Sequence, residues 1–160
     1  METHLKEIAE KTLKYLCVGS YIEGINFYGL KVIFSESDTN KNRLDGQIYL
    51  NIESRFIIYN TWPETFPQSE DEMPVSSWLE DSKRICDLRL KHVTNVKLGD
   101  SMPHLFIVFD SGEVLFVYGH HDKYESWQLG VLNNKFNNEV WEVVACPGDA
   151  IAIWVLEDIL

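Results

Sequence analysis

The sequence predicts an α+β fold in which an N-terminal helix packs on a bent, mainly antiparallel sheet or partial barrel. Apolar residues recur at helical spacing near the start of the chain. Short runs rich in β-forming residues follow one another from Leu88 onward. Turn signals separate these runs at short intervals, which favours antiparallel strands over β–α–β units.

The helix is expected over residues 4–18, where Leu5, Ile8, Leu13 and Leu16 fall on one face. Thr3 precedes this run and is placed to begin the helix with a capping arrangement. Glycines at 19 and in 24–29 then end the helix, and the run LKVIF at residues 30–34 predicts the first strand.

The middle of the chain contains two more β-rich runs, QIYLNIES and RFIIYNTW, which meet near residues 53–55. Their adjacency predicts an antiparallel hairpin. Residues 35–46, SESDTNKNRLDG, are expected to form a solvated loop. Residues 63–74 combine acidic residues with prolines, which lack the donor that an internal strand needs, so a long exposed acidic loop packed by Phe66 is expected. The next segment, VSSWLEDSKRICDL, is compatible with a short helix or a strand.

The second half is expected to supply most of the sheet. Residues 110–112, DSG, predict a tight hairpin between HLFIVF and EVLFVYG. The runs YESWQLGVL, VWEVVA and AIAIWVL predict three further strands. Trp127, Trp141 and Trp154 are expected to pack in the core, the last two across a strand pair.

Composition predicts one cytoplasmic domain spanning residues 1–160. The N-terminus lacks the apolar stretch of a signal peptide, and no window approaches the roughly 18 apolar residues of a membrane span. Three widely spaced cysteines fit a reducing compartment. The net charge of −11 repels phosphate backbones, so no nucleic-acid partner and no membrane partner are expected.

Cys146 stands in CPGD between two apolar runs and is the first candidate for chemistry. A nucleophilic cysteine needs a thiolate stabilised by a histidine or a helix N-terminus. The residues after CPGD are instead typical of a strand. A type II turn suits Pro147 and Gly148, with Cys146 and Asp149 as its outer residues, so we predict a turn.

The histidines are the second candidate. His120, His121 and Asp122 are consecutive, and His92 and His104 lie near neighbouring strands. Consecutive strand residues point to opposite faces, and no histidine spacing typical of a metal motif occurs. We therefore expect a solvated turn, no metal and no cofactor. The carboxylate pairs Glu80–Asp81 and Glu157–Asp158 are expected to be solvated, and no nucleophile-elbow or phosphate-loop motif occurs.

The acidic stretch with aromatic residues is the best candidate for binding. Residues 62–81 carry six acidic residues and no basic one. Aromatic rings supply buried area and carboxylates steer a basic partner, whereas simple packing of the loop is the alternative. The candidate partner-binding residues are Trp62, Glu64, Phe66, Glu70, Asp71, Glu72, Trp78, Glu80 and Asp81.

The strand and turn pattern of LKHVTNVKLGDSMPHLFIVFDSGEVLFVYG, YESWQL and VVACPGDAIAIW resembles small bacterial proteins of uncharacterised or immunity-protein type. The resemblance covers about residues 88–154 and includes no catalytic motif. It implies an acidic cytoplasmic domain that neutralises a basic toxin by covering its active site.

The expected function is therefore a non-enzymatic binding protein, an immunity-type inhibitor that neutralises a basic toxin through its acidic surface. One alternative is a small-ligand-binding or metal-dependent enzyme with a cleft near His92, His104, His120 and His121. Another alternative is a structural subunit of a larger assembly. The sequence does not choose the oligomeric state.

Overall fold

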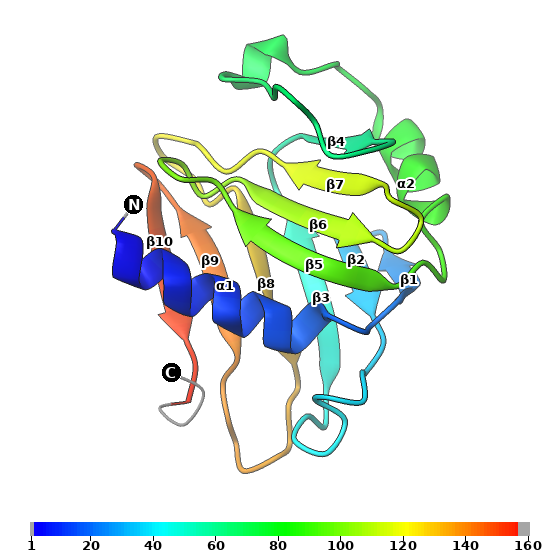
Figure 1. Cartoon of the computed structure of the whole chain (residues 1–160), viewed down its shortest axis with the longest axis vertical. Helices are drawn as coiled ribbons and strands as arrows, with labels where there is room; N and C mark the ends of the chain where they lie inside the picture. Colours follow the sequence, from blue (N-terminus) through cyan, green and yellow to red (C-terminus); the bar gives the residue numbers. More distant parts are fainter. Residues whose placement is uncertain (1, 157–160) are drawn as a thin grey trace.

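The computed structural model describes residues 2–156 and consists of two antiparallel sheets and two helices (Figure 1). The helices are α1, Thr3–Cys17, and α2, Trp78–Cys86. The six-stranded sheet contains β1, Ile22–Asn26; β2, Leu30–Phe34; β3, Gln47–Ile52; β8, Trp127–Leu132; β9, Glu142–Cys146; and β10, Ala150–Trp154. The four-stranded sheet contains β4, Phe56–Tyr59; β5, Val93–Leu98; β6, Leu105–Phe109; and β7, Val114–Val117. The predicted α+β class with a bent antiparallel sheet is confirmed.

The two sheets have the strand orders β1-β2-β3-β8-β9-β10 and β4-β7-β6-β5. The predicted hairpin between β3 and β4 is wrong, because β3 pairs with β2 and β8 whereas β4 pairs with β7. The connecting residues contain none of the Gly or Asn that tight hairpins use. The N–H groups of Glu53 and Ser54 donate to the carbonyl of Ser126, and the carbonyl of Arg55 accepts from Tyr118. The chain therefore crosses from one sheet to the other here.

The main core lies between the sheets and under α1. Leu13 and Leu16 of α1 are buried together with Phe34, Trp127 and Phe109. In Figure 1, α1 runs below β5 and across β9 and β10. The expected cap at Thr3 is wrong: the helix begins at Thr3, Glu2 precedes it, and no side chain caps this end.

The loop at residues 35–46 is a loop as predicted, but it is not fully solvated. Ser37, Asn40 and Leu44 are buried. The Asn40 amide donates to the carbonyls of Tyr15 and Leu16 at 3.3 and 2.8 Å. The last carbonyls of a helix have no N–H partner within the helix, and here a side-chain donor satisfies two of them. The polar loop therefore folds inward to cap α1.

The acidic loop after β4 covers the outer face of the four-stranded sheet. Phe106 and Phe116 form a second buried cluster there, with Met73 from the loop and Phe66 packed against them. The ambiguous segment that follows is a helix, α2. Ser77 and Glu80 form a capping box at its start, a signal that the sequence contains as S-x-x-E.

The CPGD segment joins β9 to β10 in a hairpin as predicted. The loop has three residues, because Cys146 pairs with Ala150, and both Gly148 (φ 72°) and Asp149 (φ 62°) are left-handed. The expected closing pair of Cys146 and Asp149 is therefore wrong by one residue. Trp127 and Trp141 are in the core as expected, but Trp154 is 48% exposed and faces away from it.

Candidate functional site

The structure places eight of the nine predicted partner-binding residues in three groups. Trp62 and Phe66 lie on the outer face of the four-stranded sheet. Glu70, Asp71 and Glu72 form a 3-10 turn in the acidic loop. Trp78, Glu80 and Asp81 occupy the first turn of α2. The ninth residue, Glu64, is exposed in the acidic loop between Trp62 and Phe66.

Phe66 and Trp62 contact the sheet through their rings. The Phe66 ring lies 5.3 Å from Phe106 and 5.7 Å from Phe116, measured between centroids. Trp62 lies 5.1 Å from Phe106, and the Lys97 ammonium lies 5.1 Å from its ring centroid. Phe66 packs the loop, whereas Trp62 covers the edge of the cluster and keeps 47% of its surface exposed.

Trp78 lines a different feature, which we call the aromatic hollow. Its ring contacts Phe27 edge to face at 6.2 Å, and each of the two side chains is 69% exposed. The hollow has a volume of about 270 Å³. Its lining residues are Phe27, Gly29, Leu30, Ile52, Ser54, Phe56, Trp78, Asp81 and Ser82. Large exposed rings around a concave surface are typical of a protein-binding site.

A second concave surface, the acidic hollow, adjoins the first because Ser54 lines both. Its volume is about 480 Å³. Its lining residues are Glu53, Ser54, Glu70, His121, Tyr124, Glu125 and Ser126. Ser54 belongs to the segment where the chain crosses between sheets, so this crossing brings the two hollows together.

The acidic hollow and its surroundings have a negative electrostatic potential, which affects the pKa of the nearby Tyr118 phenol. Burial raises the pKa of the Tyr118 phenol, and the carboxylates of Glu70, Asp149, Glu72 and Asp71 raise it further. Within residues 2–156, none of Glu53, Glu70 and Glu125 forms a salt bridge. No cation of the described residues neutralises these three carboxylates, so they are available to a partner.

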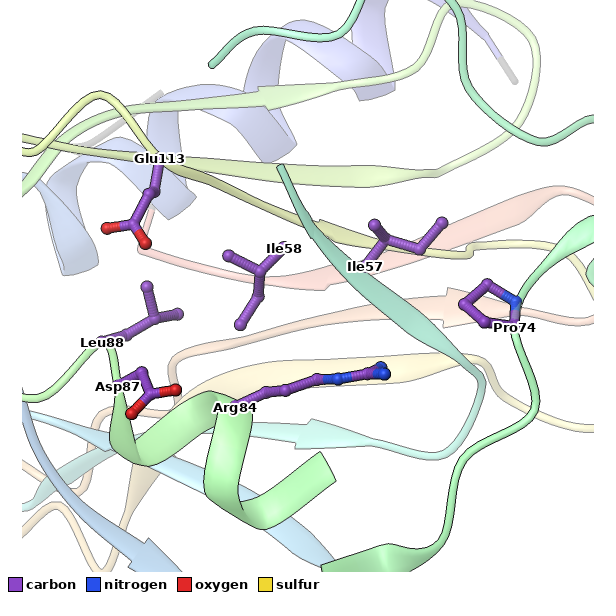
Figure 2. Close-up of a pocket in the computed structure, with 7 residues that line it drawn as sticks. All are labelled: Ile57, Ile58, Pro74, Arg84, Asp87, Leu88 and Glu113. Atoms are coloured by element: carbon purple, nitrogen blue, oxygen red, sulfur yellow. The ribbon is translucent and has the colours of Figure 1, made fainter. Parts of the chain in front are cut away.

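A third hollow lies between α2 and the edge strand β4 (Figure 2). Its volume is about 330 Å³. Its lining residues are Ile57, Ile58, Pro74, Arg84, Asp87, Leu88 and Glu113. The charges here are largely balanced, since Arg84 lies 3.8 Å from Asp81 and Glu113 bonds with Lys91. The three carboxylates that line the acidic hollow, by contrast, form no salt bridge within the described residues.

The histidines are dispersed. His104 is buried among Phe66, Phe116 and Tyr118, and its Nδ1 accepts from the Gly119 N–H at 2.9 Å. His92 directly precedes β5, and its Nδ1 lies 3.5 Å from Asp110 of the β6–β7 turn. Within residues 2–156, no group of three or more His, Cys, Asp or Glu side chains is placed to hold a metal ion.

His120 and the CPGD turn, which are far apart in the sequence, lie together in the fold. His120 Nδ1 lies 2.7 Å from Asp149 Oδ1, and Gly148 donates to the carbonyl of His121. Burial raises the pKa of the Cys146 thiol, and Glu125 raises it further. This direction is opposite to the one that activates a cysteine nucleophile. The second carboxylate pair, Glu157–Asp158, lies outside the described residues.

Sequence reasoning missed Phe27, Glu53, Tyr124 and Glu125 as candidate site residues. They come from the β1–β2 turn, the crossing segment and the start of β8. No spacing in the sequence connects these segments, because only the strand order makes them neighbours.

No protein-family model, curated protein or solved structure matches this chain. In the part of the chain that the structure describes, no helix is long and apolar enough to cross a membrane. The case for a function therefore depends on the chemistry of the two adjoining hollows.

Proposed function

We propose that this protein is a non-enzymatic binding module that docks a basic protein on the face formed by the aromatic hollow and the acidic hollow. The observation that carries the proposal is the adjacency of exposed rings and uncompensated carboxylates, joined at Ser54. Buried rings supply most of the affinity of a protein interface, and charge complementarity supplies steering and specificity.

The centre of this face is Trp78 with Phe27 on one side and Glu70 with Glu53 and Glu125 on the other. Asp81 lines the aromatic hollow, and Asp71, Glu72 and Glu80 extend the negative charge around both hollows. Trp62 and Phe66 contact the four-stranded sheet, and Glu64 is exposed between them. These three residues are assigned to the rim of the docking face, where contacts contribute less than those at the centre.

An immunity-type inhibitor that acts in the cytoplasm is the form of binding module we favour. The net charge of −11 and the resemblance of residues 88–154 to small bacterial immunity-type proteins support it. The partner would then be a basic toxin domain, and the acidic hollow would cover a positively charged surface of it.

The test is a capture experiment with the product of the adjacent reading frame, or with a single basic protein isolated from a lysate of the source organism. We expect the Trp78→Ala variant to bind this partner at least tenfold more weakly, because a central tryptophan is often a hot spot. Trp154→Ala is the matched control, since Trp154 is 48% exposed on β10 and lines neither hollow.

Charge supplies the second arm of this test. Replacing Glu70, Asp71 and Glu72 by Lys should weaken binding and reduce its dependence on salt, because the carboxylates steer a basic partner. Unchanged affinity and unchanged salt dependence in this variant, together with full binding by Trp78→Ala, would disprove the proposed face.

A further inference from the structure

We propose that the acidic hollow binds the guanidinium of an arginine side chain, supplied by the basic partner. This inference depends on the proposed function for the identity of the partner, but the hollow itself is tested separately. The wall residues that carry it are Glu53, Glu125, Tyr124 and Ser126.

The two carboxylates at the ends of β3 and β8 are held in place by amides of the sheet. Asn51 Nδ2 donates to Glu53 Oε1 at 2.6 Å, and the Gln128 amide donates to Glu125 Oε2. Asn51 and Gln128 are register partners on β3 and β8. Each carboxylate therefore keeps its other oxygen for a ligand while its orientation is already fixed, which lowers the entropy cost of binding.

Ser126 provides an observation independent of the negative charge. The residue lines the hollow and is 1% exposed, yet its hydroxyl oxygen has no hydrogen-bond partner within the described residues. A buried polar group without a partner is costly and is uncommon in native proteins. The main-chain carbonyl of Ser126 accepts hydrogen bonds from the N–H groups of Glu53 and Ser54, so Ser126 lies directly beside these two residues of the hollow. A ligand with several donors at the base of the hollow would supply the missing bond.

The aromatic wall favours arginine over lysine. Tyr124 is 68% exposed, and its ring lies 4.9 Å from that of His121 at an interplanar angle of 41°. His121 Nδ1 accepts the N–H groups of Lys123 and Tyr124, both at 3.0 Å, which requires a lone pair on this nitrogen. A planar guanidinium stacks on such rings and directs five donors at surrounding oxygens, whereas an ammonium does neither as well.

The guanidinium of Arg55 lies near Glu70 but has another role. Arg55 Nη1 donates to the main-chain carbonyl of Glu70 at 2.9 Å and to that of Met73 at 3.4 Å. These bonds hold the 3-10 turn against the sheet. Arg55 forms no salt bridge with the Glu70 carboxylate, so this carboxylate is left to the hollow.

The probe is N-acetyl-arginine amide, titrated into the full chain and followed by ¹H–¹⁵N NMR. N-acetyl-citrulline amide matches its shape without the charge, and N-acetyl-lysine amide keeps the charge without the planar donors. We expect saturable shifts at the amides of residues 53–54 and 124–126, with a dissociation constant on the order of millimolar. Arginine should bind at least threefold more tightly than lysine, and citrulline should give no saturable shift.

Variants locate the binding. Glu53→Gln and Glu125→Gln should each weaken arginine binding about fivefold or more, and Glu7→Gln on the exposed side of α1 should not change it. Ser126→Ala should also weaken binding while leaving the thermal unfolding temperature unchanged or raised, because the variant removes an unsatisfied hydroxyl. A purely structural role for Ser126 would not affect the affinity for the probe.

Equal binding of citrulline, equal binding of lysine, or shifts centred elsewhere would overturn the arginine site. The outcome is separable from that of the proposed function. Partner capture that depends on Trp78 without any arginine binding would retain the docking face and reject this inference. Arginine binding that depends on Glu53, with no partner that requires Trp78, would retain this site and reject the docking face.

Discussion

Two groups of aromatic side chains lie on the outside of the sheets, and they differ in whether the chain covers them. On the four-stranded sheet, Phe106 and Phe116 are buried beneath Phe66 and Met73 of the acidic loop. Beside α2, Phe27 and Trp78 contact each other and remain 69% exposed. The rings are of the same kind, so composition alone does not separate a packing role from a binding role.

The acidic loop explains this difference. Its apolar residues Phe66 and Met73 face the sheet, while Glu64, Asp71 and Glu72 stay exposed to solvent. The loop therefore completes the covered cluster and at the same time brings Glu70 to the acidic hollow. The loop covers Phe106 and Phe116, so these rings contribute to stability. No loop covers Phe27 and Trp78, so these rings can contact a partner.

A substitution in the covered cluster should have the largest effect on stability. Phe116 is fully buried between Phe106 and Phe66. We expect Phe116→Ala to lower the free energy of unfolding by about 3–5 kcal/mol, as lost burial and a cavity add together. Urea denaturation followed by tryptophan fluorescence measures this change. Phe116→Leu is the matched control and should cost less than half as much; a loss below about 1 kcal/mol for Phe116→Ala would show that the cluster is not a packed core.

His104 gives the covered cluster a dependence on pH. Burial lowers the pKa of His104 to about 4, an effect that nearby Asp149 opposes and His120 reinforces. The unfolded chain, with a histidine pKa near 6.5, binds the proton first as pH falls. The stability that depends on a neutral His104 is therefore complete above about pH 6.5, and roughly 3 kcal/mol of it is lost as the pH falls from about 6.5 to 4.

The measurement is the free energy of unfolding at several pH values between 7 and 4 for the native chain and for His104→Asn. Asparagine retains an acceptor for the Gly119 N–H and does not titrate. The free energy of unfolding should fall less between pH 7 and 4 for the variant than for the native chain. The difference between the two falls is the contribution of His104. Parallel pH profiles for the two proteins would mean that His104 titrates equally in the folded and unfolded states.

Much of the covered region can be predicted from the sequence, because its strands and turns depend on local sequence signals. The hairpin at residues 110–112 and the strands around it follow from alternating β-rich runs and turn residues, and β5 to β7 form as predicted. α2 was left ambiguous although Ser77 and Glu80 carry its capping signal. β1 was missed because Gly24 interrupts a five-residue run, which weakens its β pattern.

The uncovered region was harder to predict from the sequence, because the strand order brings together residues that are distant in the chain. Trp78, Glu70 and Asp81 were identified from composition, but their neighbours Phe27, Glu53 and Glu125 are distant in sequence. The error at β3 and β4 has the same origin, since two β-rich runs in succession look alike whether they pair or separate into two sheets. The segment mistaken for a hairpin turn is the one that places Ser54 between the hollows.

Substitutions of Trp62 and Trp78 test the same comparison and have the smallest expected effects. Trp62 covers Phe106 and keeps 47% of its surface exposed, whereas Trp78 is 69% exposed and contacts mainly Phe27. We expect Trp62→Ala to lower the free energy of unfolding by about 1 kcal/mol, since roughly half of a large ring returns to water. Trp78→Ala should change it by no more than about 0.5 kcal/mol, as for surface substitutions in general. Paired urea titrations measure both. If Trp78→Ala proved the more destabilising, its ring would belong to the packing of α2, and weaker partner binding by this variant would no longer indicate a docking face.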